Sequence, residues 1–478
     1  MVFNSFTFLL LFAITVIIYY SVEDKLKKYL LLFSSAVFIG YAHLAFLFVS
    51  AILSSITFLI GKWIESKDDE RTKSLIFRGG LVLNILFLCS FKYIGFLQVN
   101  IGYILEAFGI EYIPLIGHVF LPLGISFYTF QAISYLVEIY WEEQKAEKDY
   151  ASFMLYMLFF MKFISGPIER AEDFLPQIKK IKKFDYELAR SGMYLIFIGL
   201  FKKMVIADRI APYLDDIFTS VNNYSGTQLL LVIIIYPIQL YADFSAYTDM
   251  AIGGARILGF ELSPNFNRPF IAQTITDFWR RWHMSLSFWV RDYIYEPLAA
   301  SRRAWKLWGV MYALFVTFIL LGLWHGASWN FVIYGAIQGL VICYEMKTSK
   351  LRNSLNKKMP RLYPVFSVIR TYIIFSLSLL FFRIESFTDV VYVFTHMFDG
   401  IDTTFKELNL GMNDRDIIVF CFSMVLMFFY EFFDAKYSLS SALFKKPKIF
   451  RWFVYYVLTI IIILFGVFDS GDFIYLQF

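Results

Sequence analysis

His325 is the residue of this sequence whose type and surroundings best suit chemistry. It lies between Gly322 and Gly326, and apolar runs from Leu307 to Leu323 and from Trp329 to Tyr344 flank it. An ionisable ring in apolar sequence is costly to bury without a partner or water, and within membranes such residues are functional candidates. The flanking glycines permit close backbone approach or a break in a helix. A structural histidine with a satisfied ring is the alternative.

A second histidine, His283, lies in a segment from Phe260 to Pro297 that is too charged to cross a membrane and too aromatic to lie in water. The segment is rich in tryptophan and arginine: Trp279, Arg280, Arg281, Trp282, Trp289 and Arg291. Arginine can extend its charge to the headgroups, and tryptophan favours the membrane–water interface. This pattern predicts interfacial helices on the cytoplasmic side. A membrane-surface anchor is the alternative to a ligand site.

The elements that position these histidines are expected to be transmembrane helices. Of the 478 residues, 59% are hydrophobic and 21% are aromatic, which leaves too little polar sequence to cover a soluble protein. The cysteines, Cys89, Cys343 and Cys421, lie far apart in apolar runs and predict neither a disulfide framework nor a metal site. We therefore expect one transmembrane domain over residues 1–478 in the bilayer of the cell membrane, with no metal and no nucleic-acid partner.

About twelve apolar segments, in a range of about 10–13, have the length of a transmembrane or re-entrant helix. They cover residues 6–20, 29–41, 44–61, 79–97, 118–140, 192–212, 228–247, 307–324, 329–345, 365–382, 416–433 and 452–468. Lysine and arginine concentrate in alternate connecting segments, which the positive-inside rule places in the cytoplasm. The loops 98–117, 215–228 and 399–416 carry few basic residues and are expected outside, with both termini. Residues 153–166 end before Pro167 and predict a re-entrant segment.

Short motifs occur almost from end to end of the chain. They are Met1–Ser5, Leu121–Gln131, Ser165–Arg170, Tyr241–Asp249, Asn265–Pro269, Asp277–Ser287, Gly322–Trp329, Phe381–Arg383 and Phe473–Phe478. In these motifs and their order the chain resembles the membrane-bound O-acyltransferase (MBOAT) superfamily. Within it, the chain is most similar to the branch of the alginate O-acetyltransferase membrane subunit and the peptidoglycan O-acetyltransferase membrane proteins. The resemblance implies an all-α polytopic fold with its helices around a central funnel.

The resemblance also implies site residues. His325 matches the near-invariant histidine of the superfamily and His283 the second histidine of this branch, so both are expected to be catalytic. The side chains expected to bind the donor are Trp279, Arg280, Arg281, Trp282 and Arg291. Those expected to line the substrate funnel are Tyr241, Asp243, Asp249, Trp324 and Ser328. A purely structural role is the alternative for each funnel residue.

Three positions depart from the pattern of this branch. Ala246 stands where glycine is common, Gln338 where histidine is common, and Glu138 where aspartate is expected. The first two departures weaken a catalytic role for those positions, whereas the third keeps the carboxylate.

The expected reaction is transfer of acetyl from a cytoplasmic thioester, acetyl-CoA, to an extracytoplasmic polysaccharide or cell-wall polymer. Histidine titrates in the range that suits a general base, and whether His325 acts as base or carries the acyl group is left open. The longest outer stretch, from Glu385 to Asp416, is acidic and too short for a carbohydrate-binding domain. We therefore expect an exported or membrane-tethered partner with a serine-based, SGNH-like acetyltransferase domain.

Two alternatives remain. A D-alanyl transfer protein of teichoic-acid modification would share both histidines and would use a carrier-protein thioester as its donor. A polymer transporter or flippase belongs to a different class, and the sequence lacks the internal repeat that many transporters contain.

Overall fold

The computed structural model describes residues 1–113, 121–180, 182–402 and 404–468, and the regular structure within these residues is helical throughout. Parts of the predictions lie outside the described residues: positions 114–117 of the loop 98–117, positions 118–120 of the apolar segment 118–140, position 403 of the loop 399–416, and the motif Phe473–Phe478.

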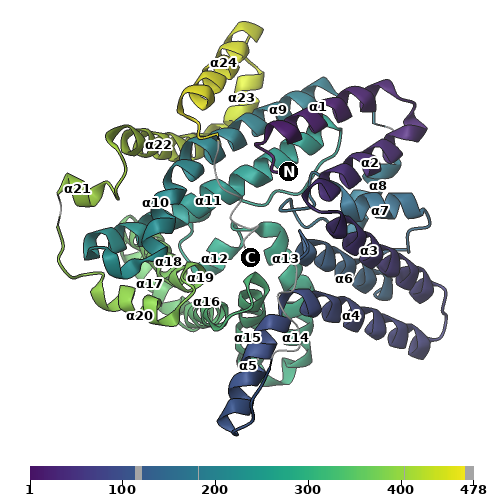
Figure 1. Cartoon of the computed structure of the whole chain (residues 1–478), viewed down its shortest axis with the longest axis horizontal. Coiled ribbons are helices and arrows are strands. Elements are labelled where there is room, and N and C mark those ends of the chain that lie inside the picture. Colours follow the sequence, from purple (N-terminus) through teal and green to yellow (C-terminus); the bar gives the residue numbers. More distant parts are fainter. Residues whose placement is uncertain (114–120, 181, 403, 469–478) are drawn as a thin grey trace.

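Most of the N-terminal helices form a group at the right of Figure 1, whereas the fifth of them extends away at the bottom. They are α1 (Phe6–Ser21), α2 (Asp24–Ala42), α3 (Leu44–Glu65), α4 (Glu70–Lys92), α5 (Ile94–Ala107), α6 (Ile125–Tyr140), α7 (Tyr150–Leu158) and α8 (Ala171–Lys179). Helix α3 packs against α2, α4 and α6. With nine residues, α7 is too short to cross a membrane, and the chain leaves the helical conformation after it.

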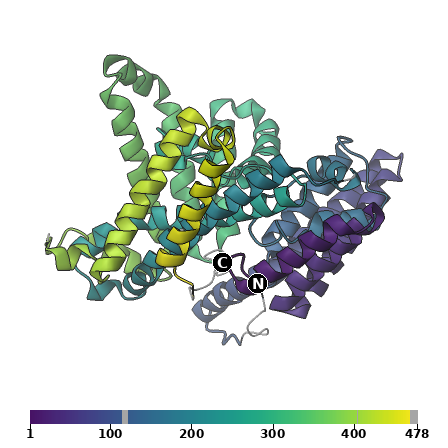
Figure 2. The same cartoon turned by 90° about the horizontal axis from the view of Figure 1, so that it is seen from above.

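The middle of the chain supplies the central helices. They are α9 (Tyr186–Leu200), the π-helix η1 (Phe201–Ala207), α10 (Asp208–Thr219), the short 3₁₀ turn η2 (Val221–Asn223) and α11 (Gly226–Ile257). Helix α11 has 32 residues and begins with a capping box between Ser225 and Gln228, which satisfies its first backbone N–H groups. It packs along α9, and the two helices run side by side near the centre of the molecule (Figures 1 and 2).

The segment with His283 folds into short helices. They are η3 (Pro269–Ile271), α12 (Ile275–Trp279), α13 (Met284–Val290), the π-helix η4 (Arg291–Tyr295), α14 (Glu296–Ser301) and η5 (Arg303–Trp305). Each is far shorter than the ~20 residues that a transmembrane helix needs. The segment therefore does not cross the membrane as a regular helix.

The C-terminal part contains a tight helical hairpin. The helices of the whole C-terminal part are α15 (Leu307–His325), α16 (Trp329–Lys347), α17 (Ser349–Lys358), α18 (Leu362–Ser378), α19 (Leu380–Arg383), α20 (Phe387–His396), α21 (Phe405–Leu408), α22 (Asp414–Tyr437), α23 (Leu439–Phe444) and α24 (Lys448–Phe465). In the hairpin of α15 and α16, a Cβ on Gly322 would stand 2.2 Å from the carbonyl oxygen of Phe331, and one on Gly335 the same distance from that of Phe318. These glycines allow the two backbones to touch, which fixes the register of the turn at His325.

Seven helices of the described residues are long and apolar enough to cross a membrane: α3, α4, α11, α15, the stretch Leu362–Arg383, α22 and α24. Each predicted apolar segment contains a helix. Several boundaries were wrong. Helices α2 and α4 begin at Asp24 and Glu70 rather than at residues 29 and 79, and α11 continues to Ile257 rather than ending at residue 247. Helix α4 also ends at Lys92 rather than at residue 97, and α5 occupies part of the expected loop 98–117. The chain turns there because Lys92 and Tyr93 bind the end of α15, a tertiary contact that local sequence does not reveal.

Candidate active site

His325 is the last residue of α15, and the backbone becomes extended at Gly326. Its ring is 4% exposed and packs among aromatic rings, with centroid distances of 4.8 Å to Trp324, 5.0 Å to Phe382 and 5.9 Å to Tyr334. The helix therefore fixes the backbone of His325, and the aromatic side chains around it fix its ring.

His283 has the left-handed backbone conformation, with φ at 44°, and its side chain is fully buried. A non-glycine residue in this region is strained, and such strain gathers at functional sites. The conformation is held from both directions. Met284 donates its backbone N–H to the carbonyl of Asn265 at 2.8 Å, and Asn267 donates to that of Arg281 at 2.8 Å.

The hydrogen bonds around Asn265 define which nitrogen of His283 carries the proton. The backbone N–H and the hydroxyl of Ser285 donate to Oδ1 of Asn265 at 3.2 and 2.9 Å, so this oxygen is an acceptor. Nδ1 of His283 lies 3.1 Å from the same oxygen and therefore donates to it. In the neutral ring Nε2 is then the basic nitrogen, able to accept a proton or a hydrogen bond. Burial lowers the pKa of His283 to about 3, so the ring is neutral at physiological pH.

Trp324 brings the two histidines together. Its ring centroid lies 4.8 Å from that of His325 and 6.0 Å from that of His283. Phe127 and Phe130 of α6 pack on the same indole, at 5.9 and 5.6 Å. Two histidines from separate parts of the chain therefore share one aromatic neighbour, in surroundings that exclude bulk water.

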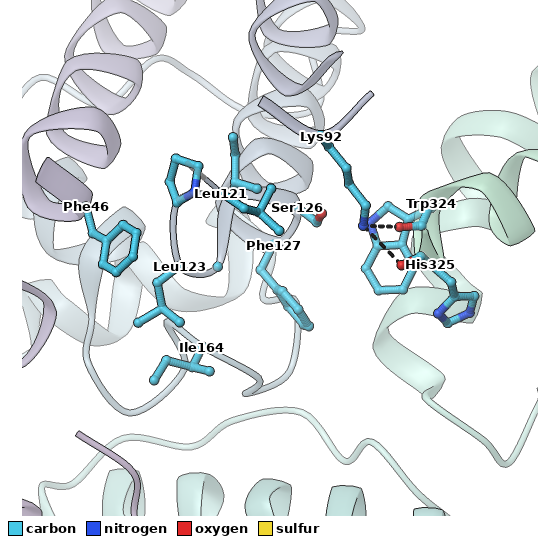
Figure 3. Close-up of a pocket in the computed structure, with 12 residues that line it drawn as sticks. Phe46, Lys92, Leu121, Leu123, Ser126, Phe127, Ile164, Trp324 and His325 are labelled. Carbon is cyan, nitrogen blue, oxygen red and sulfur yellow. Dashed lines mark hydrogen bonds between the residues drawn. The ribbon is translucent and has the colours of Figure 1, made fainter. Parts of the chain in front are cut away.

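A small cavity of about 160 Å³ opens at the end of α15 (Figure 3). Its lining comes from the N-terminal helices, the stretch Leu121–Phe127 and the end of α15: Phe46, Lys92, Leu121, Pro122, Leu123, Gly124, Ile125, Ser126, Phe127, Ile164, Trp324 and His325. Gly124 is needed here because its φ is 70° and a Cβ would stand 2.5 Å from the carbonyl oxygen of Phe163. This tight turn starts α6 and places Ser126 and Phe127 in the wall.

A larger cavity, of about 810 Å³, runs along the earlier turns of α15. It is bounded by the short helices of the His283 segment and by α15, α16 and α17; among its lining residues are Trp279, Arg280, Arg291, Thr317, Leu321 and Arg352. Leu321 precedes His325 by about one helical turn. Helix α15 therefore lines both cavities, the small one at Trp324 and His325 and the larger one as far as Leu321.

Sequence comparison places these features in a known family. Residues 33–384 match the family described as MBOAT, membrane-bound O-acyltransferase family. The chain belongs to this family. It is a multi-pass protein of the cell membrane and a membrane-bound O-acyltransferase.

Three relatives illustrate the range within this MBOAT branch. The chain is 33% identical over 416 residues to the probable alginate O-acetylase AlgI of Azotobacter vinelandii, covering 86% of this chain and 80% of that protein. It is 32% identical over 344 residues to the peptidoglycan O-acetyltransferase of Helicobacter pylori, covering 66% and 63%. It is 34% identical over 230 residues to the teichoic acid D-alanyltransferase of Bacillus subtilis, covering 46% and 58%.

The expected donor-binding residues of this acyltransferase separate into two groups. Trp279, Arg280 and Arg291 line the larger cavity. Arg281 is outside that lining, where its Nε bonds Oδ1 of Asp277 at 3.0 Å, and Trp282 packs on Phe278 with centroids 5.5 Å apart. A donor-binding role for any of the five stays a prediction.

The expected funnel residues also separate. Trp324 lines the small cavity, and Ser328 is half-buried at the N-cap of α16. The other three lie in polar contacts between helices, and the two cavity linings do not include them. These contacts are Tyr241 to Glu431 at 2.5 Å, Asp243 to Lys203 at 2.8 Å and Asp249 to Lys202 at 3.0 Å. These contacts connect α11 to η1 and α22. A role for Tyr241, Asp243 and Asp249 in lining the funnel stays a prediction.

Residues that the sequence did not single out also meet at the site. Asn265, in the motif Asn265–Pro269, holds His283, and its place in a motif beside a histidine segment was a usable signal. Lys92 reaches the backbone of Trp324 and His325 from α4 (Figure 3). A lysine at the end of an apolar run reads as an interfacial residue, so the sequence offered no signal for this contact.

Proposed function

We propose that this acyltransferase moves acetyl from a cytoplasmic thioester, acetyl-CoA, to an extracytoplasmic polysaccharide or cell-wall polymer. The observation that carries the proposal is the pair of histidines around Trp324, with one cavity at the end of α15 and another along its earlier turns. The named activities of the alginate and peptidoglycan relatives support acetyl as the group and a polymer as the final acceptor.

The larger cavity supports a small thioester donor. Its volume of about 810 Å³ falls in the range of roughly 300–1,000 Å³ that small-molecule sites occupy. Arg280, Arg291 and Arg352 supply positive charge that suits phosphate groups, and Phe318 and Leu321 supply an apolar wall for the rest of the donor. The basic residues Arg302, Arg303 and Lys306 precede α15, so the positive-inside rule puts this end of the helix in the cytoplasm.

The small cavity supports a relay through a partner. A volume of about 160 Å³ is below the roughly 300–1,000 Å³ of ordinary ligand pockets, and it is far too small for a hydrated polymer. A serine side chain on an exported, SGNH-like partner would fit. We propose that such a partner docks over the turn at residues 326–328 and the loops near Asp215 and Asp402, takes the acetyl group and passes it to the polymer.

The chemistry follows from the two histidines. In the direct route, His325 takes the proton of the acceptor hydroxyl while the acceptor oxygen attacks the thioester carbon. The tetrahedral intermediate then collapses and releases the thiolate, which receives that proton from His325. In the covalent route, a ring nitrogen of His325 attacks the thioester carbon, and the thiolate leaves with the ring proton. The acceptor oxygen then attacks the acetyl carbon of the acetyl-imidazole, and the imidazole leaves and takes the acceptor proton. In either route the neutral His283 accepts a hydrogen bond through Nε2 and orients a reacting group.

The deciding experiment uses the purified chain with labelled acetyl-CoA and a candidate serine partner. Label on the partner serine, lost in His325→Ala, supports the relay. Efficient acetylation of polysaccharide by the isolated chain would contradict the relay. Label transferred only from a D-alanyl carrier-protein thioester would favour the teichoic-acid alternative, and transport without any transfer would favour a flippase.

A further inference from the structure

The end of α15 is bound by side chains from another part of the chain. The last carbonyl groups of an α-helix have no partner within the helix. The hydroxyl of Tyr93 donates to the carbonyl of Leu323 at 2.8 Å. The ammonium of Lys92 donates to the carbonyl of Trp324 and, at 3.3 Å, to that of His325. Two consecutive residues at the junction of α4 and α5, Lys92 and Tyr93, therefore bind three consecutive carbonyls at the end of α15 that carries His325.

Lys92 is suited to this position by its charge. A cation at the C-terminus of a helix interacts favourably with the helix dipole. The ion pairs of the described residues give Lys92 no carboxylate partner. Its Nζ also lies 5.6 Å from the centroid of Trp324. The charge of Lys92 is thus directed at the helix end and at the indole between the histidines (Figure 3).

The same region holds the far side of the turn. Trp329, the first residue of α16, donates its indole N–H to Oδ1 of Asn100 at 2.9 Å, and its ring lies 5.8 Å from that of Phe96. Both Asn100 and Phe96 belong to α5. The junction of α4 and α5 therefore contacts the chain before and after residues 326–328, and His325 lies at the boundary.

We infer that Lys92 is a positioning residue for His325. Its ammonium binds the terminal carbonyls of α15, fixes the last turn of that helix, and so places the imidazole relative to Trp324 and the small cavity. The inference rests on the proposed function only for its effect on catalysis, because the effect on the ring of His325 is a property of the structure alone.

The test compares full-length variants in detergent and in liposomes. Lys92→Met removes the donors and the charge at similar length, whereas Lys92→Arg keeps both. We expect kcat for acetyl transfer to fall by about 10²-fold in Lys92→Met, as a misplacement of about 1 Å produces. The KM for acetyl-CoA should stay unchanged, because Lys92 is outside the lining of the larger cavity. Lys92→Arg should recover most of the lost kcat.

A second measurement does not depend on activity. The rate at which diethyl pyrocarbonate modifies His325, followed by mass spectrometry, should rise several-fold in Lys92→Met and remain at the wild-type value in Lys92→Arg. Tyr93→Phe removes one neutral hydrogen bond from the same turn and should raise the rate less. It also keeps the inference testable if Lys92→Met does not fold.

Lys73→Met is the matched control. Lys73 lies at the other end of α4 and pairs with Glu142, which is exposed. This variant should change neither kcat nor the modification rate. Wild-type kcat and wild-type modification of His325 in Lys92→Met would overturn the inference. The inference would also be overturned if Lys92→Arg and Lys92→Met changed kcat and the modification rate equally, because the charge and the hydrogen bonds of Lys92 would then be irrelevant. A chain that transfers no acetyl but still shows the modification pattern would contradict the proposed function and leave the positioning role standing.

Discussion

Trp279 donates its indole N–H to Oε1 of Gln338 at 3.1 Å, and Nε2 of Gln338 donates in turn to the hydroxyl of Ser378 at 2.7 Å. Trp279 and Gln338 are buried, and Trp279 lines the larger cavity. In the MBOAT branch that this chain resembles, the position of Gln338 commonly holds histidine. The unprotonated nitrogen of a histidine could accept the same hydrogen bond. Gln338 supplies the same kind of acceptor for the indole N–H of Trp279.

The first prediction concerns this acceptor. Gln338→Leu leaves the buried N–H of Trp279 without its partner, at a cost of about 1–3 kcal/mol. We expect lower thermal stability and a KM for acetyl-CoA raised by up to about tenfold, the equivalent of 1.4 kcal/mol. Gln338→His, the control, should stay near wild type. Steady-state kinetics and thermal unfolding in detergent measure both effects, and an unchanged KM in Gln338→Leu would argue against a role of Trp279 in donor binding.

The second prediction concerns the roles of the histidines. His325→Ala should lower kcat by ~10²–10⁴-fold while the protein stays inserted, because that is the typical worth of a general base. Residual activity above about a tenth of wild type would be incompatible with this role. His283→Ala should lose a similar or smaller factor. His283→Asn should keep more activity than His283→Ala, because the amide can still donate to Asn265. If the two variants of His283 were equally inactive, that residue would have to transfer protons.

The third prediction separates neighbouring arginines. Arg280 lines the larger cavity, whereas Arg281 lies outside its lining and pairs with Asp277 at 3.0 Å. Arg280→Gln should raise the KM for acetyl-CoA, and Arg281→Gln should leave it unchanged, because only the first removes charge from the proposed phosphate site. Binding of coenzyme A by titration calorimetry provides an independent measure. Equal effects in the two variants would indicate a general contribution of surface charge or a membrane-anchoring role.

The fourth prediction concerns pH and stability. Burial lowers the pKa of His283 from 6.5 to about 3 in the folded protein. Above pH 6.5 both folded and unfolded states are neutral at this residue, and its ionisation does not affect stability. As the pH falls from 6.5 toward 3, the unfolded state takes up the proton first, so the folded state loses up to about 1.4 kcal/mol per pH unit.

Thermal unfolding of wild type and His283→Asn between pH 4 and pH 8 isolates this contribution, because carboxylates titrate equally in both. The difference in Tm between the two proteins should shift in favour of the variant as the pH falls below about 6.5. A difference that stayed constant across this range would show that His283 titrates normally in the folded state.

The sequence by itself determined the class of the protein and singled out His283 and His325 as the candidate catalytic residues. Apolar runs of membrane length and the distribution of lysine and arginine are local properties, so each predicted span contains a helix. The motifs around His283 and His325 carried the resemblance to the family, which the family match over residues 33–384 confirms. The short helices between Phe260 and Pro297 followed from composition as well, since charge and aromatic content exclude a regular span.

Only the tertiary structure decided which residues meet. Lys92 belongs to an apolar run of ordinary appearance, and its contact with the carbonyls of Trp324 and His325 spans more than 200 positions of chain. Likewise, the pairing of Asp243 with Lys203 depends on how α11 lies against η1. The periodicity and composition of a sequence predict the helix to which a residue belongs, but they do not identify its partners on other helices. The partners of a buried charge are set by the packing of elements that are distant in sequence. In the protein interior, where the dielectric constant is low, an unpaired charge is costly, and the folded arrangement is the one that gives each buried charge a partner.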